Sequence, residues 1–197
     1  MCYNTQLRVE SENAMTTEMV AYYRAMLLVG IRDLFDADFD QALETDAPLS
    51  DLVLSLSTCI SDDEAVLSVL QEYLLGRTVD EQIVCNLVLE DFRCRCREGK
   101  LTRREVTDCM CCMVESMGKR WDEPWESLIT PEHALDLWQE GLIAEDVFNQ
   151  CFDAWLFEGK HINPWGLQRK RNKQNGHTKK NALLRKIRSF FRNRQGQ

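Results

Sequence analysis

The amino-acid sequence predicts an all-α fold: a compact bundle of about seven to eight helices, followed by a basic, partly disordered C-terminal tail. Two observations support this prediction. Apolar residues recur at the spacing of amphipathic helices, as in the stripe formed by Val66, Leu70, Tyr73 and Leu74. The stripes are separated by N-cap residues and by glycines that follow apolar runs, which are the signals at which helices begin and end.

Three helices are expected to open with a capping box, in which a hydroxyl residue is followed three positions later by glutamate. The boxes are Ser61 with Glu64, Thr78 with Glu81, and Thr102 with Glu105. Thr130-Pro131-Glu132 is expected to open another helix, because proline at the first helical position has no intrahelical N–H bond to lose. The expected helices cover residues 16–35, 38–45, 50–59, 62–75, 79–97, 103–117, 131–140, 144–158 and 180–194.

For segment 50–59 the sequence is compatible with either a strand or a helix. Its leucines alternate at positions 52, 54 and 56, which is the period of a half-buried strand. A lone strand would have no partner in an otherwise helical chain, so a helix is the preferred interpretation.

The charge is distributed unevenly along the 197 residues. The formal net charge is −8, but residues 161–197 contain 11 basic residues and no acidic one, which leaves −19 on residues 1–160. We therefore expect a flexible N-terminus over 1–13, an acidic helical domain over 14–160, and a basic tail over 161–197 with an exposed linker at 168–178. No apolar run could span a membrane and no secretory signal is recognisable, so the expected location is intracellular, in the nucleus and cytoplasm.

Nine cysteines, an odd number, favour reduced thiols over a disulfide scaffold. Five of them crowd between positions 94 and 112, and four of these are candidate zinc ligands: Cys94, Cys96, Cys109 and Cys112. Two facts oppose a zinc site. Cys94 and Cys96 lie about 200° apart on a continuous helix, and Cys109 belongs to an apolar stripe. We expect thiols in the core or at the surface and no cofactor, with zinc as the alternative.

The sequence contains no Gly-rich phosphate loop and no hydrolase or zinc-protease motif, and its histidines lack a flanking catalytic pattern. These absences favour a non-enzymatic protein without a small-molecule substrate. We expect it to bind a protein partner through the helical domain. Trp121, Trp125 and Trp165 stand beside prolines and charged residues and are candidates for the partner surface, although such rings also fill cores.

The tail combines basic clusters with a predicted amphipathic helix over 180–194. Its candidate residues for nuclear import or anion binding are Arg169, Lys170, Arg171, Lys173, Lys179, Lys180, Arg185, Lys186, Arg188, Arg192 and Arg194. The apolar face consists of Leu183, Leu184, Ile187, Phe190 and Phe191. Nuclear import, contact with nucleic-acid phosphates, and binding to an anionic membrane or a partner groove remain open, as does folding back onto the acidic body.

One segment resembles a known recognition motif. Leu28, Ile31, Asp33 and Leu34 follow the pattern by which BH3 helices occupy the grooves of Bcl-2 proteins, although Arg32 stands where a small residue is usual. The resemblance covers eight residues and implies helix-in-groove binding by an apoptosis regulator. Three functions thus follow. The first is a regulatory or adaptor protein, in the general style of viral accessory factors. The others are an RNA-binding silencing or interferon antagonist, and the apoptosis regulator.

Overall fold

The computed structural model describes residues 15–44 and 49–173. These residues form helices and turns and contain no strand, which confirms the all-α prediction. The chain divides into two compact units, Met1–Glu132 and His133–Gln197, so the predicted domain of residues 14–160 covers parts of both units. Within the described ranges, no helix combines the length and apolar character needed to cross a bilayer.

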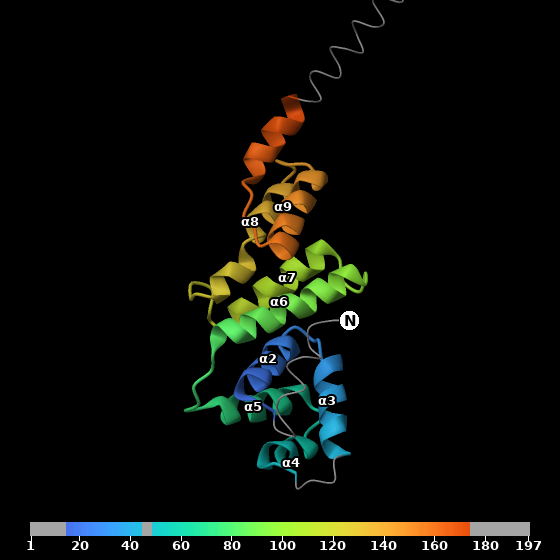
Figure 1. Ribbon diagram of the computed structural model, residues 1–197, viewed down its shortest axis with the longest axis vertical. Helices are drawn as coiled ribbons and strands as arrows, with labels where there is room; N and C mark the ends of the chain where they lie inside the picture. Colours follow the sequence, from blue (N-terminus) through green and yellow to red (C-terminus); the bar gives the residue numbers. More distant parts are fainter. Residues whose placement is uncertain (1–14, 45–48, 174–197) are drawn as a thin grey trace, which may run out of the picture. The chain divides into compact units, whose positions relative to one another are not determined.

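In the first unit, α2 packs against both α5 and α6, and α7 packs against α6 and η1 (Figure 1). Helix α4 contacts α3 and α5. The core between these helices is fully buried at Val20, Leu56, Leu70, Phe92 and Met110. The elements are α2 (Thr17–Leu27), α3 (Asp33–Leu43), α4 (Asp51–Ser57), α5 (Asp63–Leu74), α6 (Glu81–Arg97), α7 (Arg103–Ser116) and η1 (Trp125–Ile129).

In the second unit, α8 (Glu132–Gln139, which begins at the last residue of the first unit), α9 (Glu145–Glu158) and a helix over 164–173 follow one another. Its core is aromatic: Trp138 stacks on Phe148 with ring centroids 5.1 Å apart, and Phe148 contacts Phe152. Helix α9 ends at Gly159, whose left-handed backbone (φ +63°) suits a residue without a Cβ atom.

The prediction of one helix over 16–35 is wrong, because Gly30 interrupts it. Gly30 adopts a left-handed conformation with φ +73°, and the Ile31 N–H donates to the Met26 carbonyl at 3.0 Å, which closes α2 in a Schellman-type turn. A new helix, α3, begins at Asp33. The segment that resembles a BH3 helix therefore spans a turn and only the start of α3, and it does not present one continuous helical face.

Two of the three predicted capping boxes are also wrong. The box of Thr102 and Glu105 is present at the start of α7. At α5 and α6, however, the caps are Asp62 and Asp80, whose carboxylates accept two backbone N–H bonds each. Aspartate is among the strongest N-cap residues. Each of these helices therefore begins directly after its aspartate and not at the hydroxyl residue that precedes it.

Three further predictions can be compared with the structure. Helix α4 confirms that segment 50–59 is helical rather than a strand. The predicted linker over 168–178 is wrong for residues 168–173, which are helical. Asn163 and Pro164 provide the start signal of that helix. The Asn163 side chain accepts from the Trp165 N–H at 3.0 Å, and Pro164 occupies the first helical position. The predicted helix over 180–194 lies outside the described residues.

Candidate functional site

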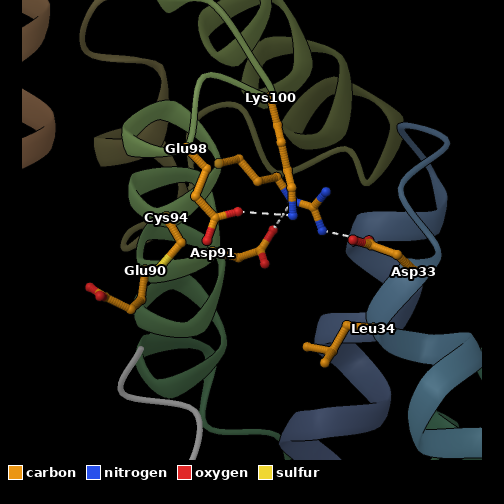
Figure 2. A pocket seen from close by; sticks show the side chains of 8 residues that line it. Asp33, Leu34, Glu90, Asp91, Cys94, Glu98 and Lys100 are labelled. Carbon is orange, nitrogen blue, oxygen red and sulfur yellow. Dashed lines mark hydrogen bonds and ion pairs between the residues drawn. The ribbon is translucent and has the colours of Figure 1, made fainter. Parts of the chain in front are cut away.

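A pocket of about 240 Å³ lies in the first unit, between the start of α3 and the C-terminal half of α6 (Figure 2). Most of its lining is charged, and every charged lining residue except Glu90, which pairs with Arg93, is paired with another lining residue. Arg95 contacts Asp33 at 2.6 Å and also bonds Asp91, while Lys100 contacts Glu98 at 2.9 Å. The complete lining is Asp33, Leu34, Glu90, Asp91, Cys94, Arg95, Glu98 and Lys100.

Arg95 is the centre of this cluster because two carboxylates share its guanidinium. Burial disfavours the charged form of Arg95, but the bonds to Asp33 and Asp91 outweigh it and raise the pKa of the guanidinium. Burial raises the pKa of the Asp91 carboxyl above its ordinary value, although Arg95 opposes this shift. Since the cations are already engaged, an anionic ligand would have to displace a carboxylate. The cluster is best described as an ion-pair network that joins α3 to α6.

Tyr22 lies behind the cluster on α2. Its ring is buried, and its hydroxyl faces the Asp91 carboxylate. Burial and, to a smaller extent, the neighbouring Asp91 carboxylate raise the pKa of this hydroxyl. A tyrosine held in its neutral form is not a nucleophile or a base at neutral pH.

The four cysteines proposed as zinc ligands are not brought together. Across residues 15–44 and 49–173, no three metal-ligating side chains converge. Seven cysteines of the described ranges have free thiols: Cys59, Cys85, Cys96, Cys109, Cys111, Cys112 and Cys151. Burial raises the pKa of both Cys85 and Cys111 to about 12, and it raises the pKa of Cys109 as well. These three thiols, of which Cys85 is buried and the other two are half-buried, therefore lack the thiolate character of a metal ligand or a nucleophile.

The predicted partner residues Trp121, Trp125 and Trp165 differ in exposure. Trp125 is 4% exposed and belongs to the core, so its assignment to a partner surface is wrong. Trp121 is 77% exposed and stands on the segment 117–124 between α7 and η1, which we call the Trp121 turn. Trp165 is 40% exposed and lies in the second unit.

Ion pairs fix the Trp121 turn to its unit. The Lys119 ammonium lies 3.0 Å from Glu81 and 3.3 Å from Asp122. The Arg120 guanidinium donates to both carboxylate oxygens of Glu132, at 2.9 and 2.8 Å, and stands 5.7 Å from the Trp121 ring centroid. Both cations of the turn are thus engaged, while the Trp121 indole that follows them faces solvent.

Glu81 connects this turn to α6. One of its carboxylate oxygens accepts from the Trp125 indole N–H at 2.9 Å, and the other faces Lys119. Sequence reasoning assigned Glu81 to a capping box. Because Asp80 caps α6 instead, the Glu81 side chain is available to bond Trp125. The contact joins residues 44 positions apart, and no local sequence signal indicates it.

The helix over 164–173 carries four of the predicted anion-binding residues. Its inner side is attached to α9: Gln168 accepts from the Ala144 N–H at 3.2 Å, and Arg171 pairs with Asp146 at 2.9 Å. Arg169, Lys170 and Lys173 are exposed. The remaining predicted tail residues lie outside the described residues: Lys179, Lys180, Leu183, Leu184, Arg185, Lys186, Ile187, Arg188, Phe190, Phe191, Arg192 and Arg194.

Comparison of the chain with protein-family models, curated proteins and solved structures finds no match. The assignment of function therefore depends on the two exposed tryptophans and the charges around them.

Proposed function

We propose that this chain is a non-enzymatic regulatory or adaptor protein whose first unit binds a protein partner through the Trp121 turn. The observation that carries the proposal is an indole that is 77% exposed on a turn in which the two preceding residues, Lys119 and Arg120, form ion pairs with Glu81 and Glu132. An exposed tryptophan on a rigid support is typical of a binding hot spot, because its large ring can be desolvated with little loss of conformational freedom.

The surroundings of the indole favour a protein over a polyanion. Lys119 and Arg120 are neutralised by their carboxylate partners. Glu123 and Glu126, which follow Trp121 in sequence, add exposed negative charge. A partner that offers an apolar pocket with a basic rim would complement this surface in shape and sign.

Affinity purification of the intact chain from cells of its natural host, with nuclease treatment, tests the proposal. Trp121→Ala is expected to lower recovery of the nuclease-resistant partner by at least about tenfold, as for a hot-spot residue. Leu75→Ala is the matched control, because Leu75 is also exposed in the first unit (68%) but lies at the end of α5. Equal recovery with Trp121→Ala and the unsubstituted chain would contradict the proposal.

The basic tail supplies the second part of the proposed function, which is direction of the protein to the nucleus. The support is compositional: residues 161–197 carry 11 basic residues and no acidic residue. Removal of residues 174–197 from the chain, fused to a large carrier so that diffusion does not mask transport, is expected to abolish nuclear accumulation. An unchanged distribution would refute this part and leave the Trp121 proposal standing.

A further inference from the structure

The second unit separates its charges along the chain. Residues 133–158 contain six acidic residues and no lysine or arginine, whereas residues 159–173 contain five basic residues and no acidic one. Two of these five cations are paired with acids of α9, Lys160 with Glu158 and Arg171 with Asp146. The other three stand on the helix over 164–173.

The contacts of that helix fix which side faces solvent. Pro164 is buried, while Leu167, Gln168 and Arg171 are half-buried. These four positions recur at intervals of three and four residues and therefore form one side of the helix. The Cys151 thiol donates to the Ile162 carbonyl at 3.6 Å, which ties the residues before the helix to α9.

The opposite side presents a tryptophan among cations. Trp165, Arg169 and Lys173 follow one another every four residues, about 6 Å apart along the axis and within an arc of about 80°. Lys170 flanks them, and all four side chains are exposed. Neither Arg169 nor Lys170 nor Lys173 forms an ion pair with another residue of the described ranges. We call this surface, formed by Trp165, Arg169, Lys170 and Lys173, the Trp165 face.

We propose that the Trp165 face binds single-stranded nucleic acid, with the indole stacked on an unpaired base and the three cations at neighbouring phosphates. Stacking platforms combined with basic grooves are the means by which proteins hold single strands without reading sequence. An exposed indole has no stacking partner in a duplex, whose bases are already stacked on one another, so a single strand is favoured. This inference goes beyond the proposed adaptor function and concerns a different surface.

A lipid surface fits the Trp165 face less well. A helix that lies in a membrane interface needs a broad apolar side. Here the other apolar residues of the helix, Pro164 and Leu167, are turned toward the protein, and Trp165 is the single apolar residue of the exposed arc. The charge complementarity of the face therefore points to phosphates, and the indole to bases.

The test is a titration of the full chain into a fluorescein-labelled 20-nucleotide uridine oligomer, followed by anisotropy at several salt concentrations. Trp165→Ala is expected to weaken binding at least about fivefold without changing the salt slope, because a stacked ring is lost and no charge is. Trp165→Phe is expected to recover most of the affinity. The double variant Arg169→Ala/Lys173→Ala is expected to lower the log–log salt slope by about 1.4, since each single-strand phosphate contact contributes about 0.7.

Two matched variants control for nonspecific effects. Trp121→Ala removes a tryptophan of the first unit, and Lys160→Ala removes a cation of the second unit that is paired with Glu158. Both are expected to bind the oligomer as the unsubstituted chain does, and circular dichroism checks that every variant remains helical. Because the rest of the basic tail is present in all variants, differences between them isolate the face.

Three results would overturn the inference. The first is unchanged affinity of Trp165→Ala, and the second is an equal loss with Trp121→Ala. The third is binding to phosphatidylserine vesicles that depends on Trp165 while oligomer binding does not. None of these results bears on the recovery of the nuclease-resistant partner, so failure here is distinguishable from failure of the adaptor proposal.

Discussion

Trp121 and Trp165 are both exposed, but their surroundings are opposite in charge balance. The cations next to Trp121 are each held by a carboxylate, and further glutamates follow. Trp165 shares its helix side with three cations that have no ion-pair partner among the described residues. The same side chain thus stands on a neutralised, acidic surface in one unit and on a basic surface in the other. An aromatic anchor alone does not specify a partner class, and the charges around it do.

The largest effect is expected when one unit is unfolded and binding at the surface of the other unit is then measured. Phe152→Ala removes a ring that is fully buried in the core of the second unit. Such truncations cost about 3–5 kcal/mol, because apolar contacts are lost and a cavity remains. We expect oligomer affinity to fall at least as far as with Trp165→Ala, and recovery of the nuclease-resistant partner to be retained.

Thiol modification measures which unit has opened in that variant. Cys151 is buried in the second unit and Cys85 in the first. Phe152→Ala is expected to speed the reaction of Cys151 with a thiol reagent and to leave Cys85 slow, because burial holds the pKa of Cys85 at about 12. Equal acceleration at both cysteines would show that the two units unfold together.

A smaller effect is expected from Glu81, which supports the Trp121 turn from α6. Glu81→Ala leaves the buried Trp125 N–H without its acceptor and is expected to cost about 1–3 kcal/mol of the free energy of unfolding. Partner recovery should fall with it, while oligomer binding stays unchanged. Glu81→Gln keeps an acceptor for Trp125 and should lose less stability in a denaturant titration. A loss as large as that of Glu81→Ala would contradict the assigned role of the Trp125 bond.

The smallest effect concerns the attachment of the helix over 164–173. Asp146→Asn removes the carboxylate that pairs with Arg171, at side-chain exposures of 54% and 40%. A pair this exposed contributes about 0–1 kcal/mol, so the melting temperature should change little. Arg171 is then no longer neutralised, and oligomer affinity should rise slightly. A decrease in affinity would indicate that the ion pair is needed to orient the Trp165 face.

The helices were predictable from the sequence wherever local signals agreed. The capping box at Thr102 and the periodic apolar residues of α5 led to correct elements because both signals act within one turn of helix. The prediction failed at Gly30, where an apolar stripe continues through a glycine that in fact closes α2. Apolar spacing does not reveal a left-handed residue inside a stripe, so the break could not be distinguished from a tolerated glycine.

The candidate surfaces were only partly predictable. Trp121 and Trp165 were identified from their neighbouring charges and prolines, but the same criterion wrongly included Trp125. Trp125 is buried and its N–H donates to Glu81, a contact across 44 residues that no local sequence signal indicates. The basic residues 169–173 were identified from composition, whereas their helical arrangement follows from Asn163, Pro164 and the contacts of Gln168 and Arg171 with α9.

One paired measurement most directly tests the claim that Trp121 binds a protein partner and Trp165 binds nucleic acid. The intact chain, Trp121→Ala and Trp165→Ala are purified in parallel from host cells, and both the nuclease-resistant protein partner and the bound nucleic acid are quantified. The account predicts that Trp121→Ala loses the protein partner and keeps the nucleic acid, and that Trp165→Ala does the reverse. Loss of the same component in both variants, or of neither, would contradict it.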